Sequence, residues 1–334
     1  MLADGVIEKS NASYYSHPVI VQKTEDKVRV CIDYRNLIKP ASWPLPNIRG
    51  LFERIEHIKP TVFGVMDLTA RYHQAPLYPP HRVFTAFLCF RGLYQFTRLP
   101  FGSKRAPSYF QEKMATKVLQ GLLYVSCEMY LDDCIVYASS EDQFLVRLKE
   151  VFQRFRERGN LLKAKKCKFG LPQIEYVGRV ISKEGLSMSM VKIQSVLNFE
   201  KPRNLEALRS LLGLAKYFRG FVPNHSLIVK PLQDMIDHNS KKKSPLVWTQ
   251  SSSDAFQAIR KVISHCPLIH FLDDTDAPIR LYTDASDYGI GGVLFQIADD
   301  IWRPISFVSK SFNATQSRWP TIQKEAYAIF HCCQ

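Results

Sequence analysis

The stretch Tyr130-Leu131-Asp132-Asp133 constrains this chain most strongly, because two adjacent acids interrupt an otherwise apolar run. Short apolar segments on both sides of such a break are typical of two strands joined in a β-hairpin. A two-residue hairpin turn favours Asn-Gly, Asp-Gly or another glycine, since its backbone reaches positive φ, and Asp-Asp suits it poorly. The pair is therefore either a solvated hairpin tip or a functional site whose carboxylates need a cation between them. Hard oxygen ligands of this kind suit Mg²⁺.

A further acid, Asp67, ends the apolar segment 62–67, which has the composition of a buried strand. By itself, an acid in this place is an ordinary turn cap. Two-metal phosphoryl transfer, however, needs carboxylates from separate strands that hold two cations about 3.5–4 Å apart. Asp67 and Asp132 would meet that need if their strands were neighbours in one sheet.

A colinear series of short stretches extends over nearly the whole chain. Each stretch alone is weakly informative, but their common order is specific. On these residues the chain resembles the reverse transcriptase region of a gypsy-type long-terminal-repeat retrotransposon Pol polyprotein. The series comprises residues 30–37 (VCIDYRNL), 43–46 (WPLP), 67–68 (DL) with 72–74 (YHQ), 85–87 (TAF), 99–102 (LPFG), 106–107 (AP), 130–133 (YLDD), 166–169 (KCKF), 176–178 (YVG), 211–214 (LLGL) and 283–286 (TDAS).

The resemblance implies an α+β fold, in which right-hand polymerase fingers and palm with an antiparallel palm sheet precede a helical thumb and a truncated ribonuclease H-like α/β domain. We expect the fingers and palm at 1–182, the thumb-like helical region at 183–240, and the connection with the truncated ribonuclease H-like domain at 245–334. Residue spacing predicts helices at 47–58, from Pro107, at 145–158 and after Asn204, strands at 279–284, 291–296 and 305–308, and a helix from 324.

The resemblance also implies an activity, that of an RNA-directed DNA polymerase extending a primer along an RNA or DNA template. Two Mg²⁺ ions, with Mn²⁺ as a substitute, would be held by Asp67 and Asp132, and Asp133 would assist close by. The primer 3′ hydroxyl would attack the α-phosphate of a deoxynucleoside triphosphate, in a reaction that depends on positioning and charge neutralisation.

Further roles follow from the same resemblance, residue by residue. Lys166 is a candidate general acid for the departing pyrophosphate, although three other lysines lie close to it in the sequence. Tyr72 would exclude a 2′ hydroxyl, unless it is an ordinary buried tyrosine. The remaining matches are Lys23 and Arg29 as a triphosphate clamp, Phe101 and Gly102 beside the nucleotide, Tyr176, Val177 and Gly178 at the primer end, and Asp284 and Glu325 as remnants of a ribonuclease H site in which we expect no hybrid cleavage.

Four positions depart from the family pattern, without removing a metal ligand. Arg71 stands in place of a glycine, Phe84 of a lysine, Arg105 of an asparagine and Val28 of an aromatic residue. They leave open a second interpretation, a catalytically weak or silent retroelement remnant that only binds nucleic acid. An unrelated two-metal nuclease or polymerase would keep the carboxylates but not the colinear series.

The formal net charge of +14 indicates a polyanionic partner or, alternatively, basicity that serves solubility. The helix predicted after Asn204 leaves Arg209, Lys216 and Arg219 outward. This basic face is either a binding surface for a polyanion or a solvated face. The eight cysteines lack metal-ligand spacing, and because several lie in apolar strands they are expected to be buried reduced thiols. We expect an intracellular protein that is cytoplasmic, in a virus-like particle, or nuclear, without a membrane partner, and joined to protease and integrase segments of a longer polyprotein.

Overall fold

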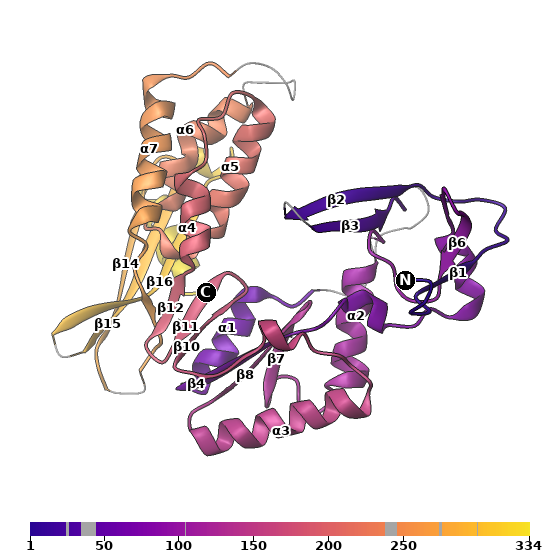
Figure 1. Ribbon diagram of the computed structural model, residues 1–334. Helices are drawn as coiled ribbons and strands as arrows, with labels where there is room; N and C mark the ends of the chain where they lie inside the picture. The colour runs from indigo at the N-terminus through magenta and orange to yellow at the C-terminus, as the bar shows by residue number, and fades with distance from the viewer. Residues whose placement is uncertain (25–26, 35–44, 104, 238–245, 274–275, 299) are drawn as a thin grey trace. The chain divides into compact units, whose positions relative to one another are not determined.

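The computed structural model describes residues 1–24, 27–34, 45–103, 105–237, 246–273, 276–298 and 300–334 (Figure 1). Residues 238–245 break the helical periodicity of the sequence, which predicts a linker, and this segment lies outside the described residues. The chain divides into two compact units, Met1–Val177 and Gly178–Gln334. No described helix is long and apolar enough to span a membrane. All eight cysteines are unpaired, as the sequence predicts, but the expected burial is wrong for most of them, because only Cys127 and Cys134 are buried.

The first unit is organised around an antiparallel four-stranded sheet with the strand order β7-β8-β4-β9. Its central strands are rich in apolar residues and are buried, and in their register Asp67 lies opposite Asp133. The two acid-bearing segments of the sequence are thus neighbours, at one end of the sheet. The strands are β4 (Val62–Asp67), β7 (Cys127–Tyr130), β8 (Asp133–Ala138) and β9 (Lys168–Leu171), and β10 (Gln173–Tyr176) follows them.

Helices pack against this sheet and close its hydrophobic core, and α3 runs alongside it in Figure 1. The sequence pattern predicts that α3 buries Leu145, Leu148, Phe152 and Phe155. This is wrong in part, because Leu145 is 61% and Phe152 37% exposed, whereas Phe144 is buried. The buried positions follow the 144, 148, 151, 155 spacing instead. The helical elements are α1 (Ile48–His57), η1 (Arg71–Gln74), η2 (Pro79–Thr85), α2 (Ala106–Lys113), the π-helical η3 (Met114–Val118), α3 (Glu141–Glu157) and η4 (Ala164–Lys166).

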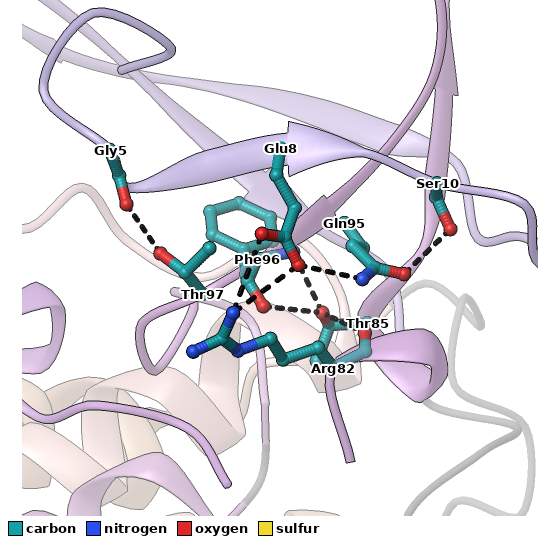
Figure 2. Close-up of polar contacts among 8 residues, drawn as sticks. All are labelled: Gly5, Glu8, Ser10, Arg82, Thr85, Gln95, Phe96 and Thr97. Carbon is teal, nitrogen blue, oxygen red and sulfur yellow. Dashed lines mark hydrogen bonds and ion pairs between the residues drawn. The ribbon is translucent and has the colours of Figure 1, made fainter. Parts of the chain in front are cut away.

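Two smaller sheets complete the first unit. The strands β2 (Pro18–Thr24) and β3 (Lys27–Ile32) form a hairpin, and the other sheet has the order β1-β6-β5. A polar network ties β1 to β6 and η2 (Figure 2): the Gln95 side chain donates to Glu8 at 2.8 Å and accepts from Ser10 at 2.7 Å. The strands of that sheet are β1 (Ile7–Lys9), β5 (Phe87–Cys89) and β6 (Gly92–Phe96).

Helices of the second unit share one core, which includes Leu208, Leu232 and Phe256. Asn204 caps α5 as predicted, since its side chain accepts a hydrogen bond from Ala207 N at 2.9 Å. The expected outward position of Arg219 was wrong, because its guanidinium donates to the Ser309 carbonyl. The helices are α4 (Met190–Leu197), α5 (Leu205–Tyr217), η5 (Arg219–Phe221), α6 (His225–Asp237) and α7 (Gln250–Ser264).

The strands of this unit belong to two antiparallel sheets, one that contains β11, β12 and β13 and one with the order β14-β15-β16. The predicted strands at 279–284, 291–296 and 305–308 are confirmed as parts of β14, β15 and β16, and the predicted final helix as part of α8. The elements are β11 (Arg179–Ser182), β12 (Gly185–Met188), β13 (Ile269–His270), β14 (Ile279–Ala285), β15 (Gly289–Ala298), β16 (Ile301–Ser311), η6 (Gln316–Arg318) and α8 (Thr321–Cys332).

Candidate functional site

The hairpin between β7 and β8 turns one residue earlier than the sequence suggests. Tyr130 pairs with Asp133, so the turn consists of Leu131 and Asp132, and Asp133 already belongs to β8. The positive φ that the turn requires falls on Leu131, at 57°. A leucine in this region costs about 1–2 kcal/mol. The expectation that the acidic pair forms the turn centre is therefore wrong, and the strain lies beside the acids.

Two buried side chains hold this turn in place, and neither was predicted from the sequence to do so. Gln111 of α2, 1% exposed, accepts a hydrogen bond from Leu131 N at 2.9 Å and donates to the Met129 carbonyl at 3.2 Å. Tyr176 of β10, also 1% exposed, donates to the Asp133 carbonyl at 3.2 Å. The hairpin that carries Asp132 and Asp133 is thus fixed by two elements distant in the sequence.

The backbone also links the three acids. Leu68, directly after Asp67, donates its amide to the Asp132 carbonyl at 3.3 Å. Asp67 and Asp133 are register partners on adjacent antiparallel strands, so their side chains lie on the same face of the sheet. The structure therefore places Asp67 and Asp133 side by side on neighbouring strands and Asp132 in the adjoining turn.

Lys166 is the cation that the structure places against these acids. Its Nζ atom lies 2.6 Å from Asp67 Oδ2, in a contact where Lys166 is 48% and Asp67 17% exposed. The pKa of Lys166 is raised first by this hydrogen bond and further by the negative charges of Asp67, Asp133 and Asp132. All three acids thus contribute to the potential at one ammonium group.

The three carboxylates match a hard divalent cation in their chemistry, because carboxylate oxygens are the ligands that Mg²⁺ prefers. Within the described ranges, no three His, Cys, Asp or Glu side chains gather closely enough to hold one ion. In this conformation Asp67 is instead engaged by Lys166. The three carboxylates are suitable ligands for a divalent metal, but the structure shows Asp67 paired with the Lys166 ammonium group.

An ion pair is buried behind the hairpin, in β7. Glu128, with a side chain 1% exposed, receives two hydrogen bonds from Arg54 of α1, at 2.7 and 2.9 Å. Burial raises the pKa of Glu128, while the hydrogen bond from Arg54 and its charge lower it. An acid inside an apolar strand is the only sequence signal of this contact, and its partner lies 74 residues away.

Among the residues expected near the nucleotide, Tyr72 lies in the core, Phe101 packs against that core and Gly102 is exposed. The Tyr72 ring is 5% exposed and packs 4.9 Å from Phe101 and 5.9 Å from Phe110, measured between ring centroids. Gly102 has φ +102°, and a Cβ atom there would lie 2.1 Å from the Ile32 carbonyl oxygen. The glycine is therefore required by the close approach of β3, whatever its role toward a ligand.

The predicted triphosphate clamp and the predicted primer contacts are placed only in part. Lys23 lies in β2 and Arg29 in β3, but their side chains lie outside what the structure describes, as does that of Val28. Among the expected primer residues, Tyr176 is buried, and Val177 and Gly178 both have positive φ, at 49° and 72°. A Cβ atom at Gly178 would lie 2.6 Å from the Tyr217 hydroxyl.

Two of the four departures from the family pattern line one pocket of about 820 Å³ in the first unit. Phe84 is 48% exposed there, and Arg105 is exposed at the start of α2. The side chain of Arg71 lies outside the described residues. The pocket is further lined by Tyr34, Pro76, Leu77, Tyr78, His81, Thr85, Leu99, Pro100, Ser103 and Tyr109.

The two acids of the expected ribonuclease H remnant lie on separate elements of the second unit. Asp284 is exposed on β14 and faces Gly291 of β15, and Glu325 is half-buried on α8. Next to Glu325, the buried Lys324 extends its Nζ to within 2.8 Å of Asp287. Gly291 and Gly292 lie within β15, as strand residues.

Two regions of the chain match known protein families. Residues 16–181 match the family model of reverse transcriptase (RNA-dependent DNA polymerase), and residues 248–334 match the RNase H-like domain found in reverse transcriptase. The chain is 31% identical to the retrovirus-related Pol polyprotein from transposon 297 of Drosophila melanogaster, over 98% of this chain and 31% of the relative. It is 30% identical to the Tf2-3 transposon polyprotein of Schizosaccharomyces pombe, over 98% of this chain and 24% of the relative. The chain thus spans about a third or less of these relatives.

Solved structures share its fold. A foamy viral protease-reverse transcriptase in complex with double-stranded DNA superposes with a TM-score of 0.85 at 22% identity, covering 99% of this chain and 57% of the other. The foamy viral protein in complex with an RNA/DNA hybrid gives a TM-score of 0.81 at 22% identity, covering 99% of this chain and 44% of the other. The expected α+β polymerase fold with a ribonuclease H-like region is confirmed.

Proposed function

The chain belongs to the reverse transcriptase family of gypsy-type retrotransposon Pol polyproteins, and on that premise we propose that it extends a primer along an RNA or DNA template. The observation that carries the proposal is the register of the sheet, in which Asp67 lies opposite Asp133 while Asp132 occupies the adjoining turn. Carboxylates on neighbouring strands are what two-metal nucleotidyl transfer requires.

Asp67, Asp132 and Asp133 would hold two Mg²⁺ ions, or Mn²⁺ in their place. Bound there, such ions supply neutralisation of the charge that develops on the phosphates. The chain's own contribution is positional, since Gln111 and Tyr176 fix the backbone of the hairpin that presents the acids. Lys166 is our candidate for the group that protonates the departing pyrophosphate.

The proposed substrates are a primer–template duplex and deoxynucleoside triphosphates. The related foamy viral proteins were solved with double-stranded DNA and with an RNA/DNA hybrid, and the net charge of +14 suits a polyanion. Tyr72, Phe101 and Gly102 are proposed to lie near the incoming sugar, with Lys23 and Arg29 on the triphosphate and Tyr176, Val177 and Gly178 near the primer end. Protease and integrase segments are proposed as its neighbours in a longer polyprotein.

Primer extension by the purified chain tests this function. Asp132→Asn should reduce Mg²⁺-dependent deoxynucleotide incorporation on a primed RNA template by about a thousandfold or more, because it removes one charge from the carboxylate set. Asp142→Asn, the same exchange at an exposed acid in the first turn of α3, should have no effect. If the unmutated chain binds primer–template but extends it with neither Mg²⁺ nor Mn²⁺, the silent-remnant interpretation replaces this one.

A further inference from the structure

We propose that Lys166 is the resident counter-ion of the carboxylate site: its ammonium group holds the place of a divalent cation on Asp67 and has to leave before that cation binds. The inference rests on the proposed function, since it assumes that the three acids are metal ligands. It adds a competition between a side chain of this protein and the metal. The contact that carries it is the 2.6 Å hydrogen bond from Lys166 Nζ to Asp67 Oδ2.

The backbone around Lys166 is fixed to the strand that carries Asp67. Lys163, three residues earlier, donates its amide to the Asp67 carbonyl at 2.8 Å, and Lys168, two residues later, pairs with Val65 in β4. The lysine therefore approaches Asp67 from a turn anchored on both sides. Because the backbone on both sides is bound to β4, the Lys166 ammonium group stays near Asp67 when the ion pair opens.

The two partners differ in exposure, which determines which of them moves. Asp67 is held at the end of a sheet strand and is 17% exposed, whereas Lys166 is 48% exposed on a flexible four-carbon stem. Lys166 can thus turn into solvent without opening the core, while Asp67 stays in position for a metal. Release of the lysine is the low-cost step in any exchange of cations.

Electrostatics give the lysine a reason to be there. Asp67, Asp132 and Asp133 lie within one turn and one register pair, and like charges so placed repel each other. One ammonium group relieves part of that repulsion while no metal is bound. The same positive charge repels an arriving divalent cation, so that lysine and metal binding oppose each other. Of the four lysines at positions 163, 165, 166 and 168, all in the described part of the chain, Lys166 is the one shown in an ion pair with Asp67.

Direct Mn²⁺ binding, measured by electron paramagnetic resonance of free Mn²⁺ without nucleic acid, tests the competition. Lys166→Gln should bind Mn²⁺ about fivefold tighter or more than the unmutated chain, because the competing charge is gone. Lys165→Gln removes the same charge from the neighbouring exposed residue and should change the affinity much less. Lys166→Arg keeps a cation and should bind Mn²⁺ as weakly as the unmutated chain.

Asp67→Asn separates the two proposals. If its Mn²⁺ affinity falls while Lys166→Gln binds no tighter than the unmutated chain, the counter-ion role is overturned and the metal site stands. If no variant shows binding that depends on Asp67, the metal site of the proposed function and the counter-ion role both fail. Thermal unfolding checks the result independently: Mn²⁺ should raise the melting temperature of Lys166→Gln by more than that of the unmutated chain, and equal shifts would contradict the proposal.

Discussion

Two pairs of acids in this chain lie in contrasting surroundings. Asp67 faces Asp133 across β4 and β8, and its side chain is 17% exposed. Asp284 faces Gly291 across β14 and β15 and is exposed, while Glu325 lies on the separate helix α8. Asp67 and Asp133 were selected first as acids beside apolar segments, whereas Asp284 and Glu325 were selected from the resemblance to the family. All four residues are carboxylic acids, so the two pairs differ in the contacts that hold the elements around them.

The hairpin of the first pair is held by polar side chains from three other elements, of which Gln111 and Tyr176 are buried. Gln111 and Tyr176 bind its backbone, and Arg54 neutralises Glu128 inside β7. At the second pair, the neighbouring ion pair joins Lys324 to an Asp287 side chain that is 85% exposed. Catalysis depends on groups held in a fixed geometry. The contrast indicates that the surroundings of Asp67 and Asp133 are held more rigidly than those of Asp284 and Glu325.

The largest effect on stability is expected from Tyr72→Ala, which removes a ring buried between Phe101 and Phe110. Deleting a buried aromatic ring costs about 3–5 kcal/mol of unfolding free energy, measurable by urea denaturation. Tyr282 on β14 is 47% exposed, so Tyr282→Ala should lower the unfolding free energy by about 1 kcal/mol or less. If the variant still folds, primer extension with competing ribo- and deoxyribonucleotides tests its sugar discrimination. Equal losses of stability at the two tyrosines would remove this difference between the regions.

Arg54→Ala should cost about 3 kcal/mol at neutral pH, because it leaves the buried Glu128 carboxylate without its partner. Removing the arginine removes what lowers the pKa of Glu128, so burial then raises that pKa further. An acid whose pKa is higher in the folded state loses stability as the pH rises through that value, so the deficit should shrink toward acidic pH. Urea denaturation at acidic and neutral pH measures it. Arg49→Ala, which breaks an exposed pair, is the control, and a pH-independent deficit would contradict the argument.

Gln111→Met should destabilise the chain by about 2 kcal/mol, since Leu131 N and the Met129 carbonyl lose their partner in a buried place. Primer extension should fall by about 10- to 100-fold, because the hairpin is no longer held in position. Gln153→Met, the same exchange at an exposed position of α3, is the matched control. Full extension by the Gln111 variant would show that the turn needs no bracing.

The smallest effect is expected at Asp284. Because this carboxylate is exposed, Asp284→Asn should change the unfolding free energy by about 0.5 kcal/mol or less. We also expect neither the variant nor the unmutated chain to degrade the RNA of an RNA/DNA hybrid. Hybrid cleavage that the exchange abolishes would place a working site in the second unit and end the contrast drawn above.

Local patterns in the sequence predicted much of this structure. The apolar segments around Asp67 and Asp132 are strands, and Asn204 caps its helix, because strand composition and caps depend on nearby residues. The apolar face of α3 was partly wrong, since Phe144 and Leu145 are adjacent and equally apolar. Which of them is buried depends on the sheet that the helix meets.

The braces of the site were missed for a similar reason. Glu128 is a single acid in an apolar segment, and Gln111 stands beside the charged Glu112 and Lys113. Nothing near either residue in the sequence indicates its partner. Arg54 lies 74 residues from Glu128, and Gln111 lies 20 residues from Leu131. Contacts of this range are decided by how elements pack, so spacing alone does not reveal them. The roles of the predicted site residues remain proposals.

The left-handed backbone of Leu131 has a consequence for the order in which the chain folds. An isolated β7–β8 hairpin would disfavour this turn, because leucine tolerates positive φ poorly. The hydrogen bond that compensates comes from Gln111, on α2, and exists only after that helix has docked. We therefore expect the turn to close late, after β8 has paired with β4. Pulsed hydrogen exchange during refolding should show the Leu131 amide gaining protection after the amides of β8, and simultaneous protection would contradict this order.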